Sequence, residues 1–81
     1  MAEPAKKESH LPKPDPDNAN ARRAFWGADA LSSYAYRTQC DPEDVLSDLL
    51  TDLMHYCDRR DLDFAHELQR AQNNYQGETT P

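Results

Sequence analysis

The feature that most constrains this chain is an acidic tetrapeptide that runs directly into an apolar stripe with helical spacing. The tetrapeptide Asp41-Pro42-Glu43-Asp44 precedes a segment whose apolar side chains recur every three or four residues. These side chains are Val45, Leu46, Leu49, Leu50, Leu53, Met54, Tyr56 and Cys57. Asp41 is a favourable N-cap, Pro42 suits the first helical position, and acids in the first turn complement the helix dipole. The pattern therefore predicts an amphipathic central helix over residues 42–60.

A first helix is predicted before the central one. Asn18 or Asn20 can cap it, and it is expected to end near Thr38. Small and apolar side chains share one of its faces at helical spacing. They are Ala24, Ala28, Leu31 and Ala35.

A third helix is predicted after the central one. Asp63 is a suitable N-cap for a helix over residues 64–76, and Gly77 is a typical residue at its end. The stripe that this helix presents consists of Phe64, Leu68, Ala71 and Tyr75. No segment shows the alternation of a strand. The fold class is therefore predicted to be all-α, a small three-helix bundle over residues 21–77 with a frayed C-terminus at residues 78–81.

The predicted core lies along the central helix. We expect this helix to pack between the other two through side chains that its stripe brings to one side. They are Leu46, Leu49, Leu50 and Leu53. On this interpretation Leu50→Asp is expected to unfold the domain.

Residues 1–20 differ from the rest in composition. They contain four of the six prolines, and Leu11 is their only large apolar residue after Met1. Such a segment cannot bury enough surface to offset its ordering entropy, so a disordered, partly polyproline-like arm is expected. Whether this arm is a solvated tail or a docking segment stays open. It lacks the apolar region of a signal peptide, and no stretch is long enough to span a bilayer, so we expect a soluble, cytoplasmic protein.

Charge is distributed unevenly along the chain. The formal net charge is −6, made up of −1 in residues 1–20, +2 in residues 21–39 and −7 in residues 40–81. An acidic chain without clustered Lys and Arg is not expected to bind nucleic acid directly. The concentration of acid in the second half instead favours a protein partner with a basic surface.

The two cysteines are not expected to form a disulfide. Cys40 precedes the central helix and Cys57 lies near its end, which separates them by about 25 Å in a continuous helix. A disulfide needs Cα atoms closer than about 7 Å. Both residues are therefore expected to be free thiols, and Cys57 is expected to be buried.

Three aspartates recur every four residues on the central helix. We call Asp44, Asp48 and Asp52 the acidic ridge. They lie on the side opposite Leu46, Leu50 and Leu53. One interpretation is a partner-binding surface that engages a basic protein. The other is an ordinary solvated face. The sequence leaves both open.

A metal site is an alternative use of the same helix. Asp48, Asp52 and His55 share a face, and His66 is the main candidate for a further ligand. No recognised metal motif is present, so no metal or other cofactor is expected. Catalysis is not expected either, because His55 and Cys57 are two positions apart and do not face each other on a helix. The chain also lacks a glycine-rich loop.

The aromatic residues are numerous for three short helices. Trp26 and Tyr36 lie off the main stripe of the first helix. Aromatic side chains of this kind either complete a small core or anchor a protein partner or homodimer interface. A homodimeric structural protein is therefore the second functional hypothesis.

Residues 21–75 resemble a group of small helical proteins encoded by phages, prophages and plasmids of proteobacteria. The resemblance is carried by the stretch DVLSDLLTDLMHYCDR at residues 44–59 and by three short segments after it. These segments are Leu62-Asp63-Phe64, Arg70-Ala71 and Asn74-Tyr75. The resemblance implies a helical bundle, an origin in a mobile element and an accessory role such as inhibition of a host protein. It implies no catalytic or binding residue.

Overall fold

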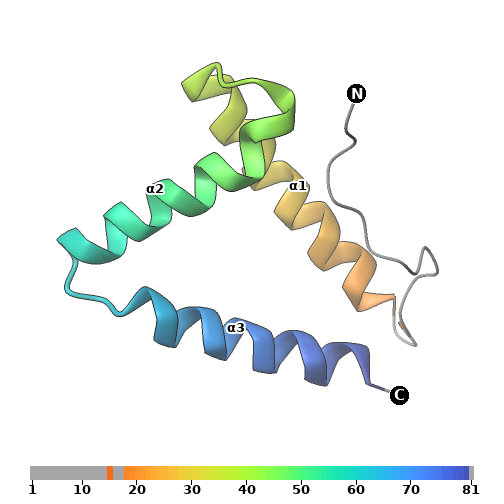
Figure 1. The fold of residues 1–81 in the computed structure, drawn as a ribbon. Helices are drawn as coiled ribbons and strands as arrows, with labels where there is room; N and C mark the ends of the chain where they lie inside the picture. Colours follow the sequence, from red (N-terminus) through yellow and green to blue (C-terminus); the bar gives the residue numbers. More distant parts are fainter. Residues whose placement is uncertain (1–14, 16–17, 81) are drawn as a thin grey trace, which may run out of the picture.

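The fold is formed by three α-helices, as the computed structural model in Figure 1 shows. The structure describes residue 15 and residues 18–80. Helix α1 spans Ala19–Thr38, a short 3₁₀ turn η1 spans Pro42–Asp44, α2 spans Val45–Arg59 and α3 spans Phe64–Thr79. No strand occurs in this part of the chain. The all-α, three-helix prediction is therefore confirmed.

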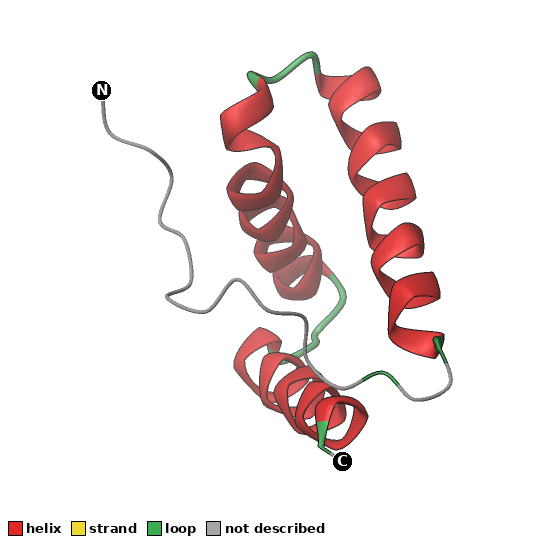
Figure 2. Ribbon diagram, turned by 90° about the vertical axis from the view of Figure 1, so that its right-hand side faces the viewer, coloured by secondary structure: helices red, strands yellow, loops and turns green. Residues whose placement is uncertain are grey.

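Helix α2 is the middle element of an open arrangement. It contacts α1 on one side and α3 on the other. Figure 1 shows the three helices as the sides of an open triangle, and in Figure 2 α3 lies across the lower ends of α1 and α2. The C-terminal end of α3 returns to the start of α1, where the Asn20 side-chain amide donates a hydrogen bond of 2.7 Å to the Glu78 carbonyl. Arg23 and Glu78 form an ion pair of 3.3 Å at the same corner.

The start of α1 is capped by a residue that the sequence did not indicate. Asn18 occupies the N-cap position, but its backbone is left-handed with φ 57° and its side chain makes no capping hydrogen bond. The Asp15 carboxylate instead accepts hydrogen bonds from the backbone N–H groups of Asn20 and Ala21, at 2.9 and 3.0 Å. An acid at this end also complements the helix dipole.

The central helix begins with a tighter turn than predicted. Pro42 follows the extended residue Asp41, and the first turn is a 3₁₀ turn in which the Asp44 N–H donates to the Asp41 carbonyl at 2.9 Å. The Asp41 side chain makes no capping hydrogen bond. The helix ends at Arg59, close to the predicted boundary.

Helix α3 begins as predicted but ends later. The Asp63 side chain accepts a hydrogen bond of 3.1 Å from the His66 N–H, which confirms it as the N-cap. The helix continues through Gly77 to Thr79, so the prediction that it ends at Gln76 was wrong. The contacts of Glu78 with α1 hold this last turn.

The predicted core is the main correction. Within the described residues only Cys57 is buried, with 7% of its surface exposed. Leu46 is 59% exposed, Leu50 42% and Leu53 40%, whereas Leu49 is half-buried. The reason is that the three helices stay open: Leu46 only borders the hollow between α1 and α2, and Leu50 and Leu53 are only partly covered. Cys40 and Cys57 are free thiols, as predicted.

Some predictions fall on residues without a described structure. Most of the predicted arm, residues 1–14, 16 and 17, lies outside the described residues, whereas Ala19 and Asn20 belong to α1. Across residues 15 and 18–80, none of the helices has the length and apolar character needed to cross a membrane.

Candidate protein-interaction surface

One regular apolar surface of the described residues lies on α2. We call it the leucine face, and it consists of Leu46, Leu50, Leu53 and Met54. Each of these side chains is between 40% and 59% exposed. Their spacing of three or four residues places them together on one side of the helix. The leucine face is therefore an apolar surface that the described helices leave partly exposed.

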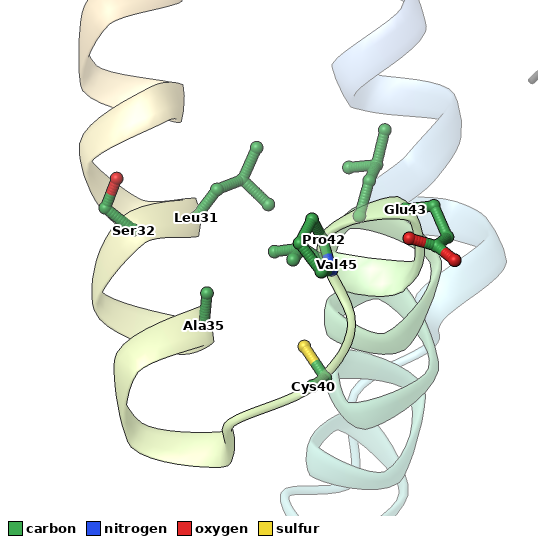
Figure 3. Close-up of a pocket in the computed structure, with 8 residues that line it drawn as sticks. Leu31, Ser32, Ala35, Cys40, Pro42, Glu43 and Val45 are labelled. Atoms are coloured by element: carbon green, nitrogen blue, oxygen red, sulfur yellow. The ribbon is translucent and has the colours of Figure 1, made fainter.

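Two acids lie at the ends of the leucine face. Glu43 precedes Leu46 by three positions, and Asp58 follows Met54 by four, so both continue the same row of side chains. Both are exposed. Figure 3 shows the Glu43 carboxylate pointing away from α1. The leucine face is therefore bounded by negative charge at each end.

The structure turns part of the acidic ridge toward α1. Asp44 is exposed and Asp48 is half-buried. The Asp52 carboxylate accepts a hydrogen bond of 2.5 Å from the hydroxyl of Tyr34 on α1. Sequence reasoning missed this partner, because Tyr34 is offset from the predicted packing face of Ala24, Ala28, Leu31 and Ala35. Asp44 is thus the member of the ridge that is most open to a protein partner.

The contact with Asp52 changes the acidity of Tyr34. The hydrogen bond to Asp52, partial desolvation and the negative charges of Asp52 and Asp48 raise the pKa of the Tyr34 phenol from 10.0 to about 12. Because the folded state favours the neutral phenol, this contact stabilises the fold fully below pH 10 and is lost as the pH rises toward 12.

We expect Tyr34 to ionise only near pH 12. Its phenolate absorbance is obtained by subtracting the pH titration of the Tyr34→Phe variant from that of the wild type. Asp52→Asn should move this difference to lower pH, because the amide removes the negative charge beside the phenol. A difference curve that is the same with and without the Asp52 carboxylate would show that the two side chains do not interact in solution.

A second exposed apolar surface lies on α1. We call it the outer face, and it consists of Phe25, Trp26 and Tyr36 with Arg22 and Arg37. The three aromatic side chains are 68%, 62% and 82% exposed. Helical spacing places these residues on the side opposite Leu31, which faces α2. The predicted residues Trp26 and Tyr36 therefore share one surface, to which the structure adds Phe25 and the two arginines.

A shallow hollow of about 400 Å³ lies between the end of α1 and the start of α2. Its lining is mostly apolar and consists of Leu31, Ser32, Ala35, Cys40, Pro42, Glu43, Val45 and Leu46. In Figure 3 the Cys40 thiol points into the space between the two elements, and Leu31 points from α1 toward Pro42.

The metal alternative has no geometric support among the described residues. No group of three or more His, Cys, Asp or Glu side chains in residues 15 and 18–80 is placed to hold a metal ion. Asp48, Asp52 and His55 are therefore not brought together as a site, and His66 on α3 does not complete one. The Asp52 carboxylate has the Tyr34 hydroxyl as its partner instead.

No protein family, curated protein or solved structure matches this chain in sequence or fold comparisons. The resemblance to phage, prophage and plasmid proteins therefore stays a prediction. The leucine face and the outer face carry the argument about function.

Proposed function

We propose that this chain is a non-enzymatic protein–protein interaction module whose central helix docks on a basic protein surface. The observation that carries the proposal is the exposure of the leucine face, since only Cys57 is buried among the described residues. Exposed apolar patches bordered by polar residues are typical of protein-interaction sites. A chain this small also gains much of its stability from a partner, because its own core is small.

The acids around the leucine face support a partner of opposite charge. Glu43 and Asp58 bound the face at its ends, and Asp44 is exposed near its start. Charges at the rim of an interface steer association and select a complementary partner more than they add affinity. Asp48 and Asp52 contribute less in this proposal, because they lie toward α1.

The resemblance to mobile-element proteins adds a narrower proposal about biology. On this proposal the partner is a host protein that the chain inhibits or regulates. The support for it is the resemblance over residues 21–75, which is an association and not a physical argument.

The proposal is tested by affinity capture with the tagged full chain and a matched pair of variants. We expect the wild type to retain a protein partner that withstands nuclease and is released by high salt. The double variant Leu46→Ser/Leu50→Ser should lose that partner, because it removes apolar surface from the centre of the contact. Gln72→Ser on α3 is the control, since it changes an exposed side chain away from the leucine face.

Two results would contradict the proposal. One is capture that is equal for the wild type and the Leu46→Ser/Leu50→Ser variant. The other is capture that disappears on nuclease treatment, since the bound species would then be nucleic acid or a protein held through it.

A further inference from the structure

We infer that the basic surface bound by the leucine face is the outer face of α1 in a second copy of this chain. The inference rests on the proposed interaction module, but it names a second copy as the partner in place of the host protein that the resemblance suggests. Each copy carries one leucine face and one outer face, so a single chain contains both halves of the contact. The contact between copies therefore requires no other protein.

The charges at the ends of the two faces match in sign and in spacing. Arg22 and Arg37 lie fifteen positions apart on α1, on either side of the exposed aromatic residues. Glu43 and Asp58 also lie fifteen positions apart, on either side of the leucine face. Arg22 and Arg37 span about 22 Å along α1, and Glu43 and Asp58 span a similar length from η1 to the last turn of α2. When the two faces meet, both arginines can therefore stand opposite an acid at the same time.

The same charges disfavour the two simpler contacts between copies. Two leucine faces brought together would place Glu43 and Asp58 against the same acids of the other copy. Two outer faces would likewise place Arg22 and Arg37 against arginines. Like charges opposed across an interface are destabilising. The pairing of an outer face with a leucine face is the combination in which the end charges attract.

The exposed aromatic side chains supply a substantial part of the area that a stable contact needs. The three aromatic side chains of the outer face are 62–82% exposed. Since one buried aromatic side chain covers about 150–250 Å², they supply roughly 400 Å² of contact surface. A stable interface buries about 800 Å² on each partner. The aromatic side chains of the outer face thus provide about half of the area that one copy contributes to such a contact. The leucine face of the same copy forms a separate, second contact.

The two faces point in different directions on one chain. Leu31 and Tyr34 on α1 face α2, and the outer face lies on the opposite side of α1. Leu50 and Met54 of the leucine face lie away from the side of α2 that Asp52 presents to α1, whereas Leu46 borders the hollow between the two helices. A contact between two different surfaces is heterologous, so it continues from copy to copy and forms a closed ring or an open chain.

One residue of α1 opposes this contact. Asp29 is the only acid of α1 and lies between Arg22 and Arg37 on the outer face. Its carboxylate must approach the apolar centre of the leucine face when the copies associate. Asp29→Asn should therefore strengthen association, and a weaker association of this variant would contradict the proposed placement.

The proposal is tested by a pair of charge-swapped variants in sedimentation experiments. Arg22→Glu/Arg37→Glu makes both faces of a chain acidic, and Glu43→Arg/Asp58→Arg makes both faces basic. We expect wild-type chains to form species heavier than the 9.3 kDa monomer as concentration rises. Each variant alone should associate at least about tenfold more weakly, because attraction becomes repulsion. An equimolar mixture of the two variants should recover the wild-type affinity.

The mixture is also the control for net charge and for misfolding. The two variants together carry the same total charge as two wild-type chains, and only folded variants can restore the association. Trp26, the single tryptophan, reports the contact independently through a shift of its emission to shorter wavelength on association.

The inference is overturned if helical wild-type chains stay monomeric at the highest soluble concentration, or if the mixture stays as weakly associated as its components. Neither result would contradict the proposed function, because the capture experiment tests binding to other proteins separately.

Discussion

Replacing Cys57 by aspartate is expected to detach α3 from α2 and to lower the thermal stability of the chain more than any other single change. Cys57 is the one buried side chain of the described residues, at 7% exposure. Its carbonyl also accepts the Leu62 N–H at 2.9 Å in the turn between the two helices. Burying an unpaired carboxylate there should cost about 3 kcal/mol or more.

The measurement is helical circular dichroism during thermal unfolding at two pH values. Cys57→Asp should recover part of its stability in acid, where the carboxyl group is neutral and its burial costs less. Cys40→Ser is the control, because Cys40 is only half-buried and a change there should stay within about 0.5 kcal/mol. A Cys57→Asp variant that melts like the wild type would show that the α2–α3 junction is not packed in solution.

Leu50→Asp is expected to remove partner binding while it leaves the helices of the isolated chain nearly unchanged. The sequence alone predicted that this substitution unfolds the domain. The structure leaves Leu50 42% exposed at the centre of the leucine face, so the added charge stays in contact with water in a monomer. In a complex the same charge would be buried at the centre of the contact, where single substitutions commonly cost 2 kcal/mol or more, which is roughly thirtyfold in affinity.

The two effects are separated by measuring helicity on dilute protein and binding by capture and sedimentation. Gln72→Asp adds the same charge on α3, and we expect it to change neither quantity. Cooperative loss of helicity in dilute Leu50→Asp would instead place Leu50 in a core that the free chain already forms, and the leucine face would then not be available to a partner.

The helices themselves could be predicted because their signals are local. The Asp63 cap and the Pro42 start depend on residues within one turn, and the structure keeps both boundaries. Helical periodicity also identified Cys57 as the side chain to bury. These features depend on backbone hydrogen bonding and capping chemistry, which act over a few residues.

What covers an apolar stripe could not be predicted in the same way. The pattern on α2 identifies which side chains prefer to leave water, but it does not say whether the neighbouring helix reaches them. Leu49 is half-buried and Leu46 is 59% exposed, although both belong to the same stripe. The hydrogen bond from Tyr34 to Asp52 spans eighteen positions and depends on how two helices cross. The Asp15 cap depends on the course of the chain before the helix.

The corner where α3 returns to α1 has a consequence for how the fold opens. The hydrogen bond from Asn20 to Glu78 joins residues that are 58 positions apart, and the ion pair between Arg23 and Glu78 at the same corner is partly exposed to solvent. Bringing together residues so far apart in the chain costs more conformational entropy than forming a single helix turn. At this corner the cost is offset by a hydrogen bond and a partly exposed ion pair. Amide hydrogens in the last turns of α3 should therefore exchange with solvent earlier than those of α2, so that thermal motion opens this corner first and leaves the α1–α2 pair intact.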